Sequence, residues 1–193
     1  MKVPLAENWH QQRLGMRPYP LNRPDKEFLD AKHQELHDQG RMEWTTEASP
    51  FASPVFVVWR KDKPRVVVDL RALNSVAIPD AYPMPIPAEM VHKLAGKRYI
   101  SAVDARSFFH QFLVHPDHRE RFTVVSHRGL ERSVVALMGY KNSPAYAQRF
   151  IDHILRDYSE YAAGYIDDIV IYSNTAKEYL NYLKLLGFRV DGF

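Results

Sequence analysis

Two adjacent aspartates, Asp167 and Asp168, lie between two short apolar runs near the end of the chain. Tyr165-Ile166 precedes the pair and Ile169 to Tyr172 follows it, which predicts two strands joined at a two-residue acidic tip. Glycine or asparagine usually occupies such a tip, and neighbouring carboxylates repel each other. A bound cation would offset this repulsion, whereas a solvated turn would need no ligand, so both interpretations stay open here.

A third carboxylate, Asp104, ends another predicted strand, Tyr99 to Asp104. If this strand lies beside the acidic hairpin, the three carboxylates could hold Mg²⁺, which prefers oxygen ligands and keeps water and substrate phosphates in its remaining positions. Two ions roughly 4 Å apart serve phosphoryl transfer in many enzymes, and Mn²⁺ is the alternative ion. Because successive strand residues face opposite ways, we expect Asp167 to be the closer ligand and Asp168 to support the site.

The elements that must position these carboxylates alternate between helical and β-branched segments. In chain order we expect a helix at 25–39, a hairpin of 55–60 with 65–70, an extended stretch at 78–87, a short helix ending at Gly96, a hairpin of 122–126 with 130–137, and a helix begun by Asn142-Ser143-Pro144 that ends at about Tyr158. Helices together with hairpins indicate an α+β fold.

Composition bounds the class of protein. The chain has 193 residues, 46% of them hydrophobic, which is enough for one domain or two joined subdomains. Its net charge of +3 permits a nucleic-acid partner without demanding one. The absence of cysteine excludes disulfides and thiolate zinc sites, and we see no signal peptide or membrane anchor. We therefore expect an intracellular protein, cytoplasmic or nuclear, that is not secreted.

A series of motifs runs along most of the chain. They are Ser53 to Val58, Val68 to Asn74, Tyr82 to Pro85, Asp104 to Gln111, Asn142 to Ala145 with Gln148-Arg149-Phe150, and Tyr165-Ile166-Asp167-Asp168. In type and order this series resembles the reverse transcriptases of gypsy-type LTR retrotransposons. The resemblance implies a right-hand polymerase fold with an antiparallel palm sheet packed on helices. It places an arm and helix at 1–40, fingers at 41–98 and 112–143, and palm at 99–111 and 144–193.

The resemblance also implies roles for single residues. Asp104, Asp167 and Asp168 would be catalytic and would bind the metal ions. The nucleotide would contact Arg60, Lys61, Arg65, Phe109, Met138 and Gln148, with Phe109 under the sugar, where it excludes a 2′-hydroxyl. Primer and template would contact Tyr165, Asn142, Arg149, Leu186 and Gly187. Without the resemblance, the basic side chains of Arg60, Lys61 and Arg65 would belong to a solvent-exposed strand edge, and Phe109 would be a core aromatic residue. Gln148 and Arg149 would then lie on the solvent-exposed polar side of their helix.

The resemblance implies an RNA or DNA template with its primer and deoxynucleoside triphosphates as partners, within a larger polyprotein. Only twenty residues follow Ser173, whereas the family continues with a long helix and a thumb. Leu186 to Asp191 resembles the strand pair that grips the primer, but it comes too early in the chain. We therefore expect the thumb to be absent, and the alternative function is a catalytically silent remnant that binds nucleic acid or another protein.

Overall fold

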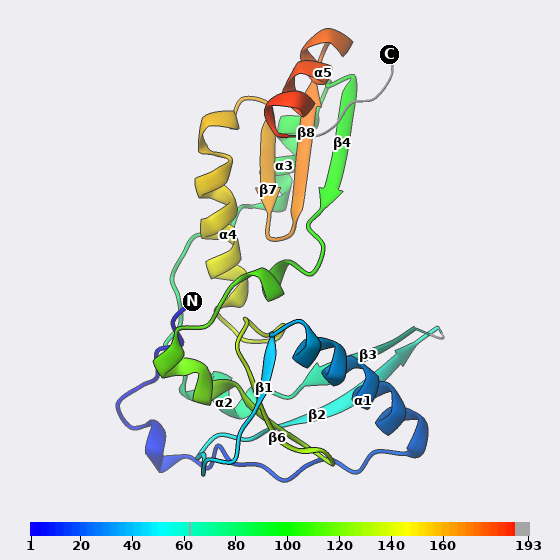
Figure 1. The fold of residues 1–193 in the computed structure, drawn as a ribbon. Helices are drawn as coiled ribbons and strands as arrows, with labels where there is room; N and C mark the ends of the chain where they lie inside the picture. Colours follow the sequence, from blue (N-terminus) through cyan, green and yellow to red (C-terminus); the bar gives the residue numbers. More distant parts are fainter. Residues whose placement is uncertain (62, 188–193) are drawn as a thin grey trace. The chain divides into compact units, whose positions relative to one another are not determined.

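The computed structural model describes residues 1–61 and 63–187. The chain divides into two compact units, each with its own sheet (Figure 1). The first unit is formed by Met1–Pro79 with Phe109–Ser143, and the second by Asp80–Phe108 with the chain from Pro144 onward. No helix among the described residues has the length and apolar character needed to cross a membrane.

The first unit contains a five-stranded sheet in the order β1-β6-β5-β2-β3. Neighbouring strands are antiparallel except β2 and β5, which run parallel. The strands are β1 (Met42–Trp44), β2 (Ser53–Arg60), β3 (Lys63–Val68), β5 (Thr123–Ser126) and β6 (Gly129–Ser133). The helical elements are η1 (Trp9–Gln11), α1 (Arg23–Asp38), α2 (Arg71–Val76), η2 (Phe108–Gln111) and η3 (Pro116–Phe122). Phe108, the first residue of η2, is assigned to the second unit.

Helix α1 confirms the helix expected at 25–39 and begins two residues earlier. The Asn22 side chain accepts a hydrogen bond from the Asp25 N–H at 2.9 Å, which caps the helix, and a proline occupies the first turn. Gly40 follows the helix with φ of 66°, a left-handed conformation that favours glycine. Leu29 and His33 face inward.

A buried ionic cluster attaches α1 to β6. Glu131 is fully buried, and its carboxylate lies 2.7 Å from His33 Nδ1, 2.9 Å from His37 Nε2 and 3.0 Å from Arg128 Nε. Burial opposes ionisation of Glu131, but the hydrogen bond and charge of His33, followed by His37 and Arg128, prevail and lower its pKa to about 2. Removing one partner from such a buried pair costs about 3–5 kcal/mol, because the remaining charge is left buried without its partner.

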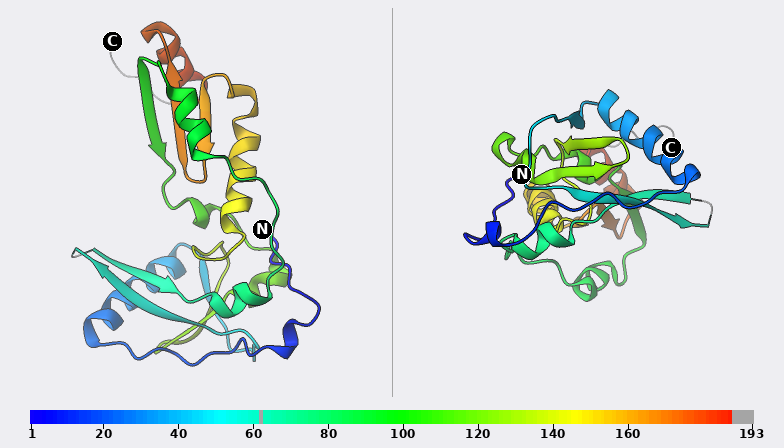
Figure 2. Two further views of the ribbon diagram at one scale, coloured as in Figure 1. Left: turned by 180° about the vertical axis from the view of Figure 1, so that it is seen from behind. Right: turned by 90° about the horizontal axis from the view of Figure 1, so that it is seen from below.

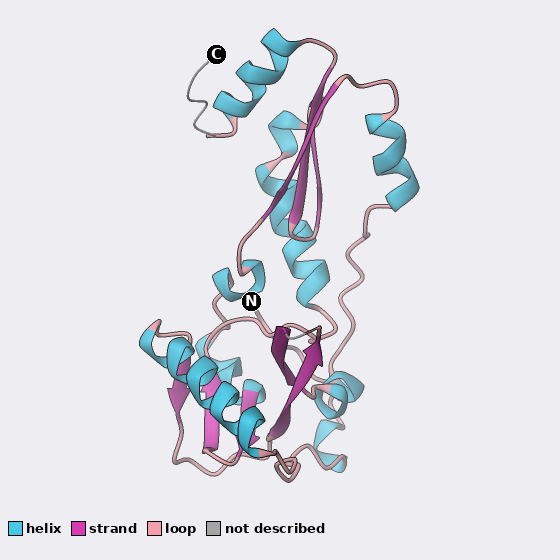
Figure 3. Ribbon diagram, turned by 90° about the vertical axis from the view of Figure 1, so that its right-hand side faces the viewer, coloured by secondary structure: helices cyan, strands magenta, loops and turns pink. Residues whose placement is uncertain are grey.

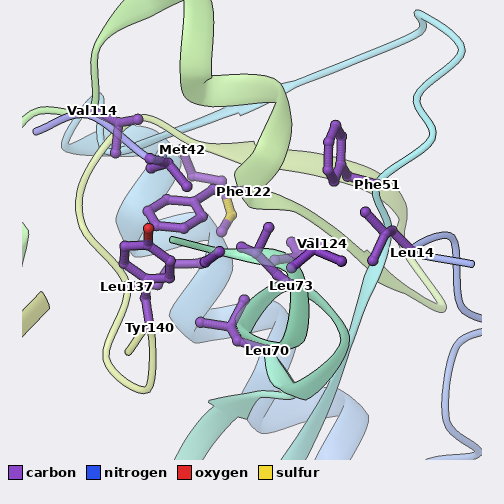
Figure 4. Close-up of a cluster of buried hydrophobic side chains, with 13 residues drawn as sticks. Leu14, Met42, Phe51, Leu70, Leu73, Val114, Phe122, Val124, Leu137 and Tyr140 are labelled. Carbon is purple, nitrogen blue, oxygen red and sulfur yellow. The ribbon is translucent and has the colours of Figure 1, made fainter. Parts of the chain in front are cut away.

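The core of the first unit lies between α2, η3, β5 and the chain around residue 140. Phe122 and Tyr140 meet edge to face at 5.2 Å, beside Leu73 and Val124 (Figure 4). Residues of the N-terminal arm join this core, since Val3 and Leu14 are buried in it. The arm is further attached by backbone bridges from Leu5 to Ala77 and from Gly15 to Ala52.

The second unit contains a fully antiparallel three-stranded sheet in the order β4-β8-β7. Helix α3 lies over one face of this sheet, and Figure 3 views the sheet edge-on (Figures 2 and 3). The strands are β4 (Tyr99–Asp104), β7 (Ala162–Tyr165) and β8 (Asp168–Ser173); the helices are α3 (Pro87–Leu94), α4 (Ser143–Ile154), η4 (Arg156–Tyr158) and α5 (Ala176–Leu185). The β4 bounds agree with the sequence prediction. Helix α4 ends at Ile154, before the predicted end at about Tyr158, and the separate 3₁₀ turn η4 follows it.

Residues 80–98, assigned to the fingers from the sequence, belong in the structure to the unit that carries the palm strands. The physical reason is that residues 80 and 82 form hydrogen bonds and a cation–π contact with side chains of α4. The Tyr82 hydroxyl donates to Asp152 at 2.6 Å, and Arg149 donates to Asp80 at 2.7 Å while its guanidinium lies 4.7 Å from the centre of the Tyr82 ring. These contacts attach the extended stretch before α3 to α4.

Helix α4 packs closely on β7 because Gly164 has no side chain. A Cβ atom at Gly164 would lie 2.0 Å from Ile151 Cγ2 and 3.2 Å from Leu155 Cδ1. Ile151 of α4 and Leu155, the residue that follows α4, are both buried. The closeness of helix and strand determines where the rest of α4 meets the β7–β8 hairpin.

Candidate active site

Asp104 and Asp168 are directly paired residues at the ends of β4 and β8. Paired residues on antiparallel strands extend their side chains to the same face, with Cβ atoms about 4.5–5.5 Å apart. The Ala105 N–H also donates to the Asp167 carbonyl at 2.8 Å, which brings the chain after β4 against the turn. The predicted closeness of Asp104 to the acidic hairpin is therefore present in the structure.

The turn itself differs from the predicted Asp-Asp tip. Tyr165 pairs with Asp168, so the two-residue loop consists of Ile166 and Asp167, and Asp168 is the first residue of β8. Ile166 has φ of 57° whereas Asp167 is not among the positive-φ residues, which is the φ pattern of a type II′ turn. Strand alternation therefore does not apply to Asp167, and the prediction that it is the closer metal ligand loses that support. Asp168 is the residue that shares a face with Asp104.

Ile166 is an unusual residue for this position. Type II′ turns place glycine there, and a β-branched side chain at positive φ costs about 1–2 kcal/mol. Such a conformation persists only where the surrounding structure enforces it. In the structure the Ile166 N–H is hydrogen-bonded to a side chain of α4.

Gln148 of α4 supplies this contact. Its side chain is fully buried, with Nε2 donating to the Gly164 carbonyl at 3.0 Å and to Asp152 at 2.8 Å. Its Oε1 accepts a hydrogen bond from the Ile166 N–H at 2.8 Å. The Gln148 amide is therefore buried and hydrogen-bonded to the β7–β8 hairpin. This corrects the prediction that Gln148 contacts the nucleotide. It also corrects the alternative that Gln148 lies on the solvent-exposed side of its helix.

The three carboxylates supply the oxygen donors that Mg²⁺ prefers. Asp168 and Asp104 are exposed, and no described side chain forms a hydrogen bond or ion pair with Asp104, Asp167 or Asp168. Among residues 1–61 and 63–187, however, no three His, Asp or Glu side chains are gathered closely enough to hold a metal ion. The three carboxylates therefore have the chemistry that a divalent cation requires. Their side chains are not gathered around a common point in the structure.

Cationic side chains share one face of the β2–β3 hairpin in the first unit. Arg60 pairs with Lys63 and Val58 pairs with Arg65, so Arg60, Lys63 and Arg65 all extend to the same side. Lys63, which the sequence predicts in the basic loop between the two strands, is in the structure the first residue of β3 and pairs with Arg60. Lys61 begins the turn with φ of 47°, and its neighbour Asp62 lies outside the described residues.

Helix α1 covers the other face of this hairpin. The Trp59 indole N–H donates to Asp25 at 2.7 Å, and the Trp59 ring lies 6.4 Å from that of Phe28. Arg60, Lys61 and Arg65 are exposed. The predicted phosphate contacts are thus available to a ligand.

A hollow of ≈ 520 Å³ lies next to the root of this cationic face. Its lining includes Phe56 and Val67 of the hairpin together with Asp69, Arg71 and Gly139. Arg71 donates two hydrogen bonds to Asp69, at 2.9 and 2.7 Å, and holds the pKa of that carboxyl far below its usual range. Met138, predicted to contact the nucleotide, precedes Gly139 and is 68% exposed.

The remaining predicted residues have different surroundings. Phe109 is half-buried in η2. Asn142 is buried and donates to the Ile78 carbonyl and the Tyr140 hydroxyl, at 2.7 and 3.1 Å, so its amide is engaged within the protein and is not presented to a template. Tyr165 is half-buried at the end of β7, and Arg149 is bonded to Asp80.

Leu186 and Gly187 end helix α5 in the structure. Their N–H groups donate to the carbonyls of Tyr182 and Lys184, and Gly187 has φ of 81°. The predicted primer-gripping strand pair would continue from Phe188 to Asp191, which lie outside the described residues. Residues 186 and 187 therefore form a helix terminus rather than the start of a strand.

Comparison with known proteins identifies the family. The profile described as reverse transcriptase (RNA-dependent DNA polymerase) matches residues 57–189. The Drosophila melanogaster retrovirus-related Pol polyprotein from transposon 297 is 31% identical over 184 residues, covering 92% of this chain and 17% of the relative. The enzymatic polyprotein of cauliflower mosaic virus (strain CM-1841) is 27% identical over 191 residues, covering 96% of this chain and 28% of the relative. The chain thus spans between about a sixth and somewhat over a quarter of these relatives.

Solved structures agree in fold. The foamy viral protease-reverse transcriptase bound to double-stranded DNA has a TM-score of 0.81 at 21% identity, covering 91% of this chain and 31% of that one. The same enzyme bound to an RNA/DNA hybrid has a TM-score of 0.82 at 21% identity, covering 90% and 23%. This confirms the polymerase fingers-and-palm fold of mixed α+β type. The chain belongs to the reverse transcriptase (RNA-dependent DNA polymerase) family.

Proposed function

We propose that this chain carries the catalytic centre of an RNA-directed DNA polymerase, which transfers a deoxynucleotide from its triphosphate to a primer 3′-hydroxyl. The observation that carries the proposal is the direct pairing of Asp104 with Asp168 beside the turn that contains Asp167. The family uses divalent metal ions, and we propose that these three carboxylates hold two Mg²⁺ ions, or Mn²⁺ in their place.

Divalent cations bound there supply Lewis-acid activation of the primer hydroxyl and neutralise charge on the leaving pyrophosphate. The protein's own contribution is positioning. The β4–β8 pairing holds two carboxylates on one face, and the Ala105 hydrogen bond holds the turn carrying Asp167 against β4.

We further propose that the cationic face formed by Arg60, Lys63 and Arg65, with Lys61 at the turn, binds the triphosphate. Guanidinium and ammonium groups stabilise the charge that develops during phosphoryl transfer. Phe109 remains our candidate for the contact that excludes a 2′-hydroxyl. Nucleic-acid partners are supported by the foamy viral enzyme, whose structures contain double-stranded DNA and an RNA/DNA hybrid.

A second candidate function is a binding module without catalysis. It is favoured by the finding that, within the described part of the chain, no three metal-ligating side chains are gathered around a common point. This candidate predicts salt-sensitive nucleic-acid binding that is unaffected by Asp104→Asn, because phosphate contacts release counterions whether or not the carboxylates are present.

The experiment is single-nucleotide extension of a DNA primer on an RNA template with Mg²⁺, comparing the chain with Asp104→Asn and Asp168→Asn. We expect extension by the unaltered chain and a loss of at least about a thousandfold in either variant, which corresponds to about 4 kcal/mol of transition-state stabilisation. Asp157→Asn, an exposed carboxylate after α4, serves as the control and should extend normally. Extension that survives both site variants would refute the proposal.

A further inference from the structure

We infer that Gln148 is a positioning residue for the catalytic hairpin, a role that rests on the proposed function. Its side-chain amide holds Ile166 in the left-handed conformation that the turn requires. It thereby determines where Asp167 and Asp168 lie relative to Asp104.

The amide of Gln148 bridges the two residues that determine the turn. It accepts from the Ile166 N–H at 2.8 Å and donates to the Gly164 carbonyl at 3.0 Å, so one planar group fixes both sides of Tyr165. Because the side chain is fully buried, water does not compete for these bonds. A change in the rotation of this amide would therefore move the backbone of the turn.

The amide is itself held in one orientation. Its Nε2 also donates to Asp152 Oδ1 at 2.8 Å, and Asp152 Oδ2 accepts from the Tyr82 hydroxyl at 2.6 Å. The Tyr82 pKa is raised by this hydrogen bond, which agrees with a phenol that remains protonated as the donor. The chain of bonds from Tyr82 through Asp152 to Gln148 specifies which end of the amide faces Ile166.

The position of Gln148 depends on close packing between α4 and β7. The absent side chain at Gly164 lets the helix approach, with Ile151 one turn further along α4 filling the space. An amide cannot reach the hairpin backbone from a more distant helix. Ile166, whose φ of 57° suits glycine, then depends on this contact to stay in the turn conformation.

The test uses Gln148→Met, which retains the length of the side chain and removes both polar atoms. Gln34→Met is the matched control, because Gln34 also donates to an aspartate four residues on, at 2.9 Å, but is exposed on α1. Two quantities are measured for each: the hydrogen-exchange rate of the Ile166 amide, and kcat and KM for the nucleotide in primer extension. For Gln148→Met we expect Ile166 exchange to rise and kcat to fall, each by about tenfold or more, with KM changed by less than about twofold.

A donor–acceptor exchange supplies the rescue. In Gln148→Glu with Asp152→Asn, the carboxylate accepts from the Ile166 N–H and the new amide at 152 donates to that carboxylate. We expect this pair to recover Ile166 protection to within about threefold of the unaltered chain, although the Gly164 carbonyl loses its donor. If Gln148→Met shows no cooperative unfolding transition, the double variant Gln148→Glu with Asp152→Asn is the deciding measurement. Failure of this double variant to protect the Ile166 amide from exchange then overturns the inference.

The outcomes separate this inference from the proposed function. Unchanged Ile166 exchange in folded Gln148→Met overturns it, as does an unchanged kcat. A raised KM at constant kcat would instead indicate a nucleotide contact and also overturn it. If the unaltered chain extends no primer, the proposed function fails, while Ile166 exchange still shows whether Gln148 holds the turn.

Discussion

Replacing Gly164 with alanine tests the packing that brings α4 to the β7–β8 hairpin. The added Cβ would lie 2.0 Å from Ile151 Cγ2, far inside the separation of about 3.5–4.0 Å that two carbon atoms prefer. Ile151 is 1% exposed and packs against neighbours that restrict its movement. Helix and strand must therefore separate, or Ile151 must leave its preferred rotamer.

The magnitude follows from two opposing effects. Overpacking of a buried site costs about 1–3 kcal/mol, whereas glycine-to-alanine replacement at an unstrained position stabilises by about 0.4–1 kcal/mol through the unfolded chain. Gly164 has no positive φ, so the second effect applies, but the depth of the overlap places the first near its upper limit. We expect a net loss of about 2 kcal/mol, which lowers Tm by roughly 4–8 °C in a chain of this size.

The assay is denaturant unfolding of Gly164→Ala, Ile151→Ala and the double variant. Ile151→Ala removes the atom that the new Cβ meets and by itself should cost about 2–5 kcal/mol. The double variant should be at least about 1 kcal/mol more stable than the sum of the single changes, whereas Ile154→Ala, on the exposed side of α4, should be additive with Gly164→Ala. Additivity with Ile151, or no loss in Gly164→Ala, would refute the packing argument.

Three further predictions concern the first unit. The Glu131 pKa lies near 2 in the folded protein and near 4.5 in the unfolded chain, so the stabilisation by its carboxylate is complete above about pH 4.5 and is lost as the pH falls toward 2. The difference in unfolding free energy between the unaltered chain and Glu131→Leu should therefore shrink over that range. A difference that stays constant with pH would contradict the ionic cluster. Replacing Arg60, Lys63 and Arg65 with glutamine should raise the nucleotide KM at least about tenfold without lowering Tm, and an unchanged KM would remove this face from the nucleotide site. Asn74→Ala should cost about 1–2 kcal/mol in urea unfolding, because the Asn74 amide donates to the Gly139 carbonyl and accepts from the Lys141 N–H, and a loss below about 0.5 kcal/mol would show that water replaces these bonds.

Local pattern was sufficient for the elements that carry the carboxylates. The β-branched run from Tyr99 ends at Asp104, and the apolar runs around Asp167 read directly as a hairpin. Asn22 and Gly40 likewise mark the ends of α1 by their capping chemistry. These features depend on residues close together in the chain.

Features that depend on distant partners were not predictable in the same way. Ile166 occupies the turn with its N–H bound by Gln148, eighteen residues earlier, and no local rule places isoleucine there. Gln148 reads as a polar residue of an amphipathic helix until β7 is seen to pack against that helix. Lys63 joins the cationic face only once the register of β2 with β3 is known.

The central claim is that Asp104, Asp167 and Asp168 form one site for divalent cations, and Mn²⁺ titration followed by NMR tests it most directly. Mn²⁺ broadens the signals of nuclei near the site where it binds. We predict that the amide signals of residues 104, 105 and 166–168 broaden first, and that Asp104→Asn abolishes the effect. Broadening centred elsewhere, or unchanged in Asp104→Asn, would contradict a shared carboxylate site.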